Sequence, residues 1–110
     1  MSPEINILVF VSSNCPHCPP AERLVREVSQ DYADKGVIFK KIRTKTPEGK
    51  ELSRRYNIMG TPTTLFMDEE GNELKRIVGV PSESNLRKKI ETFLGMRQSF
   101  VDRIFGSKTK

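Results

Sequence analysis

Histidine and cysteine, which supply most zinc ligands in proteins, are scarce in this sequence: it has one histidine and two cysteines. A closed zinc site needs four ligands, so one chain cannot build such a site from these residue types. A site shared between two chains, with Cys15, His17 and Cys18 as soft ligands, stays open as an alternative. We expect no metal and no bound cofactor.

Long apolar runs are also missing. No stretch approaches the roughly 20 apolar residues that cross a bilayer, so we expect no membrane partner. Residues 1–4 contain neither a basic region nor a small-residue cleavage site. We therefore expect no secretory signal and a cytoplasmic protein. In that reducing compartment a close cysteine pair is more often catalytic or metal-binding than structural.

Most of the chain lacks an excess of either charge. Residues 1–86 carry 12 Lys and Arg against 12 Asp and Glu, whereas residues 87–110 carry 7 against 2. The net charge of +5 therefore lies in the C-terminal segment. Basic segments can bind nucleic acid, but a solvated helix face is the commoner interpretation of such a pattern. We expect no nucleic-acid contact.

The two cysteines stand three residues apart in Cys15-Pro16-His17-Cys18. The apolar run Ile5 to Val11 before them is typical of a strand buried on both faces. The stretch Ala21 to Tyr32 after them has the apolar spacing of a helix. A helix N-terminus favours the thiolate, which is the nucleophile in disulfide exchange. The pattern therefore predicts a dithiol/disulfide redox site.

The remaining periodic segments predict an α/β domain with the order β-α-β-α-β-β-α and helices on both faces of the sheet. Two crossovers imply parallel pairing of the first three strands, and a turn at Gly71 makes the last two antiparallel. These segments are the strands Val37 to Ile42, Thr63 to Met67 and Leu74 to Val78, a helix beginning at Thr46-Pro47, and a helix capped by Ser82.

A chain of this length suits one domain, which we place at residues 1–95, and we expect a monomer. Gly95 has the place of a helix C-cap. Beyond it, the basic extension 96–110 contains Phe100, Ile104 and Phe105 at helical spacing. A short amphipathic helix that folds back on the sheet is the more ordinary outcome, because exposed aromatic residues are costly. A partner-docking element is the alternative.

Over residues 4 to about 94 the chain resembles thioredoxin-fold oxidoreductases. Three elements carry the resemblance: Cys15-Pro16-His17-Cys18 after the first strand, Gly60-Thr61-Pro62 before the third, and Gly79 after the fourth. The compact start is similar to small archaeal-type thioredoxins and glutaredoxins. The resemblance implies a thioredoxin-like fold with a four-stranded mixed sheet. It also implies a protein disulfide reductase and electron carrier, with a thioredoxin-reductase-type flavoprotein as donor.

The resemblance also implies roles for the residues around the cysteines. The peptide bond before Pro62 would be cis, Thr61 and Pro62 would contact an extended substrate segment, and Gly79 and Val80 would line the same groove. The alternative is that Pro62 merely opens a strand, where proline is tolerated.

For the reaction we expect Cys15 to be the nucleophile and Cys18 the resolving thiol. Pro16 would preset the first helical dihedral. His17 could donate a hydrogen bond or positive charge to the Cys15 thiolate, or be an ordinary exposed residue. A stabler thiolate makes the couple more oxidising, and we expect a potential about 30–60 mV above the roughly −270 mV of thioredoxin.

The sequence departs from the family in several places. It has no tryptophan, and Val9 stands where thioredoxins carry a buried aspartate that assists the second thiol. A water, His17 or Lys41 could accept the Cys18 proton instead. The Pro-His pair is the one found in strongly oxidising periplasmic enzymes, and no glutathione-binding pattern follows Gly79. A glutaredoxin-like, oxidising or isomerising enzyme is therefore the alternative function.

Overall fold

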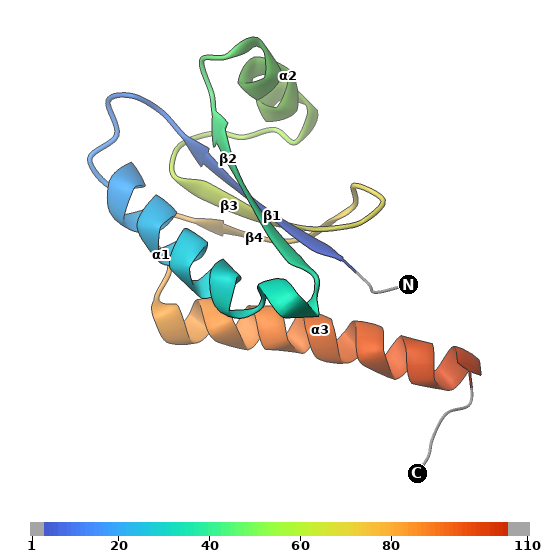
Figure 1. Ribbon diagram of the computed structural model, residues 1–110. Coiled ribbons are helices and arrows are strands. Elements are labelled where there is room, and N and C mark those ends of the chain that lie inside the picture. Colours follow the sequence, from blue (N-terminus) through green and yellow to red (C-terminus); the bar gives the residue numbers. More distant parts are fainter. Residues whose placement is uncertain (1–3, 106–110) are drawn as a thin grey trace.

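The computed structural model describes the backbone of residues 4–105 and the side chains of residues 4–95. Within this range the chain alternates strands and helices in the predicted order (Figure 1). The strands are β1 (Ile5–Val11), β2 (Val37–Arg43), β3 (Thr63–Asp68) and β4 (Glu73–Val78). The helices are α1 (Cys18–Asp31), α2 (Pro47–Arg55) and α3 (Glu83–Phe105), with a short 3-10 turn at Ala33–Lys35.

The four strands form one mixed sheet in the order β2-β1-β3-β4. The apolar β1 lies in the interior, parallel to β2 and antiparallel to β3, and β3 and β4 form an antiparallel hairpin. The hairpin confirms the prediction from the turn at Gly71. The predicted parallel pairing is confirmed for β1 and β2, but it is wrong for the third strand, because β3 runs antiparallel to β1.

The length of α2 explains this difference. Its nine residues span only about 14 Å, whereas a seven-residue strand such as β2 spans about 23 Å. The helix therefore does not return the chain to the start of the sheet, and it stands beyond the end of β2 (Figure 1). The chain re-enters at the same end, where Thr63 pairs with Phe10 near the end of β1.

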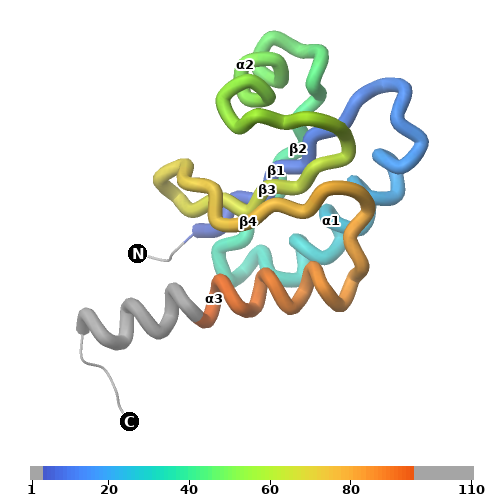
Figure 2. The backbone as a smooth tube through the Cα atoms, turned by 180° about the vertical axis from the view of Figure 1, so that it is seen from behind, coloured from blue at the N-terminus to red at the C-terminus, as the bar shows by residue number. Residues whose placement is uncertain are grey.

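Helices cover both faces of the sheet, as predicted. From behind, α1 and α3 lie side by side along one face, with α2 apart from them (Figure 2). The larger core on the α1/α3 side includes Ile5, Ile7, Val9, Val25, Val28, Phe66, Leu86 and Ile90. The smaller core on the α2 side contains Phe10, Ile42, Leu65 and Met67, with Leu52, Tyr56 and Ile58 packed against it.

Polar contacts also join α1 to α3. The Tyr32 hydroxyl, just after α1, donates a hydrogen bond to Glu91, and Arg87 pairs with Asp31 at 2.7 Å. The bond to Glu91 is the main reason that the pKa of Tyr32 lies above its ordinary value. These contacts fix α3 against the helix that follows the cysteines.

The third helix is longer than the sequence predicts. The expected end at Gly95 is wrong, because α3 continues through this residue to Phe105. Gly95 does not adopt the positive φ of a helix-ending glycine, so it costs the helix about 1 kcal/mol without stopping it. The predicted packing or docking of Phe100, Ile104 and Phe105 lies outside the described side chains.

In the part of the chain that the structure describes, none of the helices has both the length and the apolar character needed to cross a membrane.

Candidate active site

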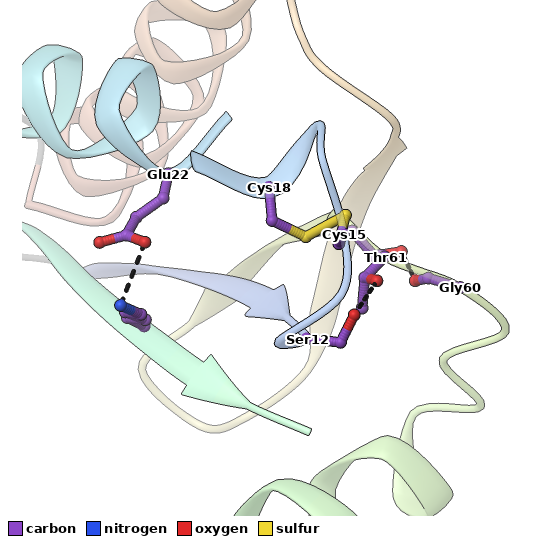
Figure 3. The surroundings of a disulfide bond; sticks show 8 residues. Ser12, Cys15, Cys18, Glu22, Gly60 and Thr61 are labelled. Atoms are coloured by element: carbon purple, nitrogen blue, oxygen red, sulfur yellow. Dashed lines mark hydrogen bonds and ion pairs between the residues drawn. A yellow bond between two sulfur atoms is a disulfide. The ribbon is translucent and has the colours of Figure 1, made fainter. Parts of the chain in front are cut away.

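The two cysteines lie where the chain passes from β1 into α1. Cys15 and Cys18 are joined by a disulfide, and their Cα atoms are 5.4 Å apart (Figure 3). The helix begins at Cys18 with His17 as its N-cap, and its first backbone bond runs from the Ala21 N–H to the His17 carbonyl at 3.3 Å. Pro16 therefore lies in the turn before the helix and not at its first position, which corrects the expected role of this proline.

The two sulfur-bearing residues differ in exposure. Cys18 is only 3% exposed and packs in the larger core, whereas Cys15 is half-buried and packs against the edge of that core. His17 is exposed, and within the described residues its side chain makes no hydrogen bond to Cys15 in this disulfide form. The structure thus places one accessible cysteine in front of one buried cysteine.

A second loop faces Cys15. The Thr61-Pro62 peptide bond is cis, as the family resemblance implies. The Ser12 and Thr61 hydroxyl oxygens are 2.9 Å apart, which ties this loop to the one that leads to Cys15 (Figure 3). The Gly79 N–H donates to the Pro62 carbonyl at 2.8 Å, so the turn after β4 joins the same site.

The structure therefore brings together the residues that the sequence singled out for substrate contact. Thr61 is half-buried, Pro62 is buried, and Val80 is 46% exposed beside Gly79. Sequence reasoning did not single out two exposed apolar residues next to these loops, Met59 and Val78. In the sequence, the one pattern that could have pointed to them is that each directly precedes a glycine of the family motifs, Gly60 or Gly79.

A cavity of about 270 Å³ opens on the other side of the disulfide, between α1 and β2. Its lining includes both cysteines and four charged residues, Glu22, Lys41, Arg43 and Lys45. Lys41 and Glu22 form an ion pair at 3.1 Å (Figure 3), and Arg26 also bonds to Glu22.

Glu22 is a residue of this cavity that sequence reasoning did not single out. It lies four residues after Cys18 on α1, a spacing that puts two side chains on one helix face. Its side chain is 15% exposed. By contrast Val9, at the position of the family's aspartate, is fully buried and offers no proton acceptor. Among the described residues, no group of three or more His, Cys, Asp and Glu is arranged to hold a metal ion.

Comparisons with known proteins agree with this geometry. Residues 4–94 match the thioredoxin-like domain family. A "Probable Thioredoxin" of Archaeoglobus fulgidus is 32% identical over 87 residues, which cover 79% of this chain and 87% of that protein. A "Thioredoxin" of Methanocaldococcus jannaschii is 31% identical over 88 residues, covering 80% and 94%. The solved structure of the germline-specific thioredoxin Deadhead of Drosophila melanogaster superposes with a TM-score of 0.69 at 25% identity, covering 81% and 80%.

The fold, the close cysteine pair and the relatives point to one chemistry. The chain is a thiol–disulfide oxidoreductase, a thioredoxin-like disulfide reductase whose redox-active group is the Cys15–Cys18 disulfide. The resemblance drawn from its motifs is confirmed over the residues that carried it. This chain belongs to the thioredoxin-like family.

Proposed function

We propose that this chain reduces disulfides in other proteins, with Cys15 as the nucleophile and Cys18 as the resolving thiol. The difference in exposure between the two residues carries the proposal, because an incoming disulfide can reach Cys15 and not the 3% exposed Cys18. The Cys15 residue also precedes the helix N-terminus, where the helix dipole stabilises a thiolate.

The reaction then runs in two exchanges. The Cys15 thiolate attacks one sulfur of the target disulfide, forms a mixed disulfide and releases the other target sulfur as a thiolate. Cys18 loses its proton, attacks the Cys15 sulfur and releases the second target thiol. Two electrons pass to the target, and the Cys15–Cys18 disulfide forms.

The groove next to Cys15 holds the target during these steps. An extended target segment lies along Thr61 and Pro62, pairing with the backbone as a short added strand does. Gly79 and Val80 form the neighbouring wall, and the hydrogen bond from Gly79 to Pro62 keeps the two walls together. The exposed apolar rim at Met59 and Val78 favours apolar residues around the target disulfide.

The buried Cys18 needs a route for its proton. Among the described residues, Glu22 is the only acidic one in the lining of the cavity that also contains Cys18. We place the proton on the Glu22 carboxylate, directly or through water in the cavity, with Lys41 holding the carboxylate from β2. His17 is exposed at the N-cap, outside the lining of this cavity, and serves this step less well.

Replacing Glu22 by glutamine tests both the activity and this route. Wild-type protein should reduce a disulfide-bonded test protein such as insulin with dithiothreitol as the electron source. In Glu22→Gln the resolving step, followed after rapid mixing, should slow about 10- to 100-fold, because a general base is lost. The first attack by Cys15 should keep its rate.

Glu27→Gln is the matched control, since Glu27 lies exposed on the same helix. Equal resolving rates in the two variants would show that the proton leaves by another route. No reduction by the wild-type protein would contradict the proposed function itself.

The compartment, the oligomeric state and the electron donor are further parts of this proposal. We propose a cytoplasmic monomer that receives electrons from a thioredoxin-reductase-type flavoprotein, with small thiols as the rival donor. The basic extension 96–110 remains a separate proposal as a packing or docking segment.

A further inference from the structure

The cavity beside the disulfide has an unbalanced charge. Three cations and one carboxylate line it, and that carboxylate, Glu22, already meets Lys41 at 3.1 Å and bonds to Arg26. Arg43 and Lys45 are exposed and form no ion pair with the described residues. We call the wall formed by Arg43 and Lys45 the cationic wall.

The cationic wall is held in place by local structure. Arg43 is the last residue of β2, and its carbonyl accepts a hydrogen bond from the Thr46 hydroxyl at 2.9 Å. Thr46 in turn caps α2 by accepting the Gly49 N–H at 2.9 Å. The two cations therefore come from a short, braced turn whose residues line the same cavity as Cys15 and Cys18.

We propose that the cationic wall makes this protein select disulfides that carry a carboxylate near the reacting sulfur. The inference rests on the proposed function, because the reaction is the reduction by Cys15 and Cys18. An arginine and a lysine that have no ion-pair partner among the described residues attract an anionic group and raise its local concentration. Arginine can also bind a carboxylate through two hydrogen bonds. The same wall repels disulfides that carry ammonium groups.

A series of small disulfides tests this selection. The protein is first reduced with dithiothreitol and separated from it, so that each molecule supplies two electrons and yields two thiols from one disulfide. The substrates are 3,3′-dithiodipropionate with two carboxylates, neutral 2-hydroxyethyl disulfide, and cystamine with two ammonium groups. Each rate is divided by the rate with dithiothreitol alone, which removes differences in intrinsic reactivity.

We expect the order anionic, neutral, cationic, with about a tenfold ratio between the extremes at low salt. At about 0.5 M salt this ratio should shrink, because the charges are screened. Equal normalised rates for all three disulfides would overturn the inference and leave the proposed function standing. Failure to reduce even the neutral disulfide would contradict the proposed function instead.

Two double variants that have the same net charge show whether the preference for anionic disulfides comes from the cationic wall. Arg43→Gln with Lys45→Gln should bring the anionic-to-cationic ratio close to one. Lys88→Gln with Lys89→Gln removes two positive charges from α3 and should leave the ratio unchanged. The same fall in both variants would mean that net charge, and not the cationic wall, sets the preference.

Peptides distinguish the two sources of such a carboxylate. Cyclic peptides whose disulfide is flanked by glutamate or by lysine offer the same charges within a protein-like segment. A preference for the glutamate peptide would show that the cationic wall selects acidic segments of protein targets. A preference seen only with the small disulfides would show that the cationic wall selects a small anionic disulfide substrate.

Discussion

Cys15→Ser is expected to abolish disulfide reduction, lowering the rate by more than about 1000-fold, because a serine hydroxyl does not ionise at neutral pH and cannot replace the thiolate. The partner variant Cys18→Ser should still attack a disulfide through Cys15 but should stop at the mixed disulfide. The buried position of Cys18 explains this asymmetry, since only its partner is accessible to a target.

Mass spectrometry after incubation with excess 2-hydroxyethyl disulfide distinguishes the two variants. Cys18→Ser should carry one 2-hydroxyethylthio group in a mixed disulfide with Cys15, with release of one 2-mercaptoethanol, whereas Cys15→Ser should carry little or none. The two variants are matched, because each loses one sulfur and neither can form the internal disulfide. The opposite pattern, with the adduct on Cys18, would reverse the assigned roles.

Gly49→Ala is expected to destabilise the protein by about 3 kcal/mol. A Cβ atom at this position would lie 1.8 Å from the Arg43 carbonyl oxygen and 2.9 Å from the Thr44 Cα atom. Both are backbone atoms, so the start of α2 would have to move away from the end of β2. Unfolding in urea, followed by circular dichroism, measures the loss.

Gly95→Ala is the control for that experiment. Gly95 lies exposed within α3, and in the described part of the chain a Cβ atom there meets nothing within 4 Å. Alanine should therefore stabilise the helix by about 1 kcal/mol. Equal stability of Gly49→Ala and wild type would contradict the close contact between α2 and β2 on which the cationic wall depends.

The parts of the fold with strong local signals were predictable. The apolar run from Ile5 to Val11 and the cap at Thr46 with Pro47 specify their elements without help from distant residues. The motif Gly60-Thr61-Pro62 and its cis bond were predictable through the family resemblance. The direction of β3 was not, because it depends on how far α2 carries the chain and no local pattern records that length.

In the site, too, some residues have a local signal in the sequence and others are recognised only from the fold. The cysteine pair is visible in the sequence because two rare residues stand at a strand-to-helix junction. Glu22 and Arg43 are ordinary charged residues on a helix and a strand, and both elements have other charged residues at exposed positions. Only the pairing of β2 beside β1, with α1 above them, shows that these two line the cavity of the disulfide.

The reduction potential of the Cys15–Cys18 couple shows whether this chain acts as a disulfide reductase. It is measured by equilibrating the protein with defined dithiol/disulfide buffers and counting free thiols. A reductase whose His17 stabilises the Cys15 thiolate should give a value between about −240 and −210 mV. A value above about −180 mV, or a couple that does not titrate reversibly, would contradict a disulfide reductase and point to an oxidising or isomerising enzyme.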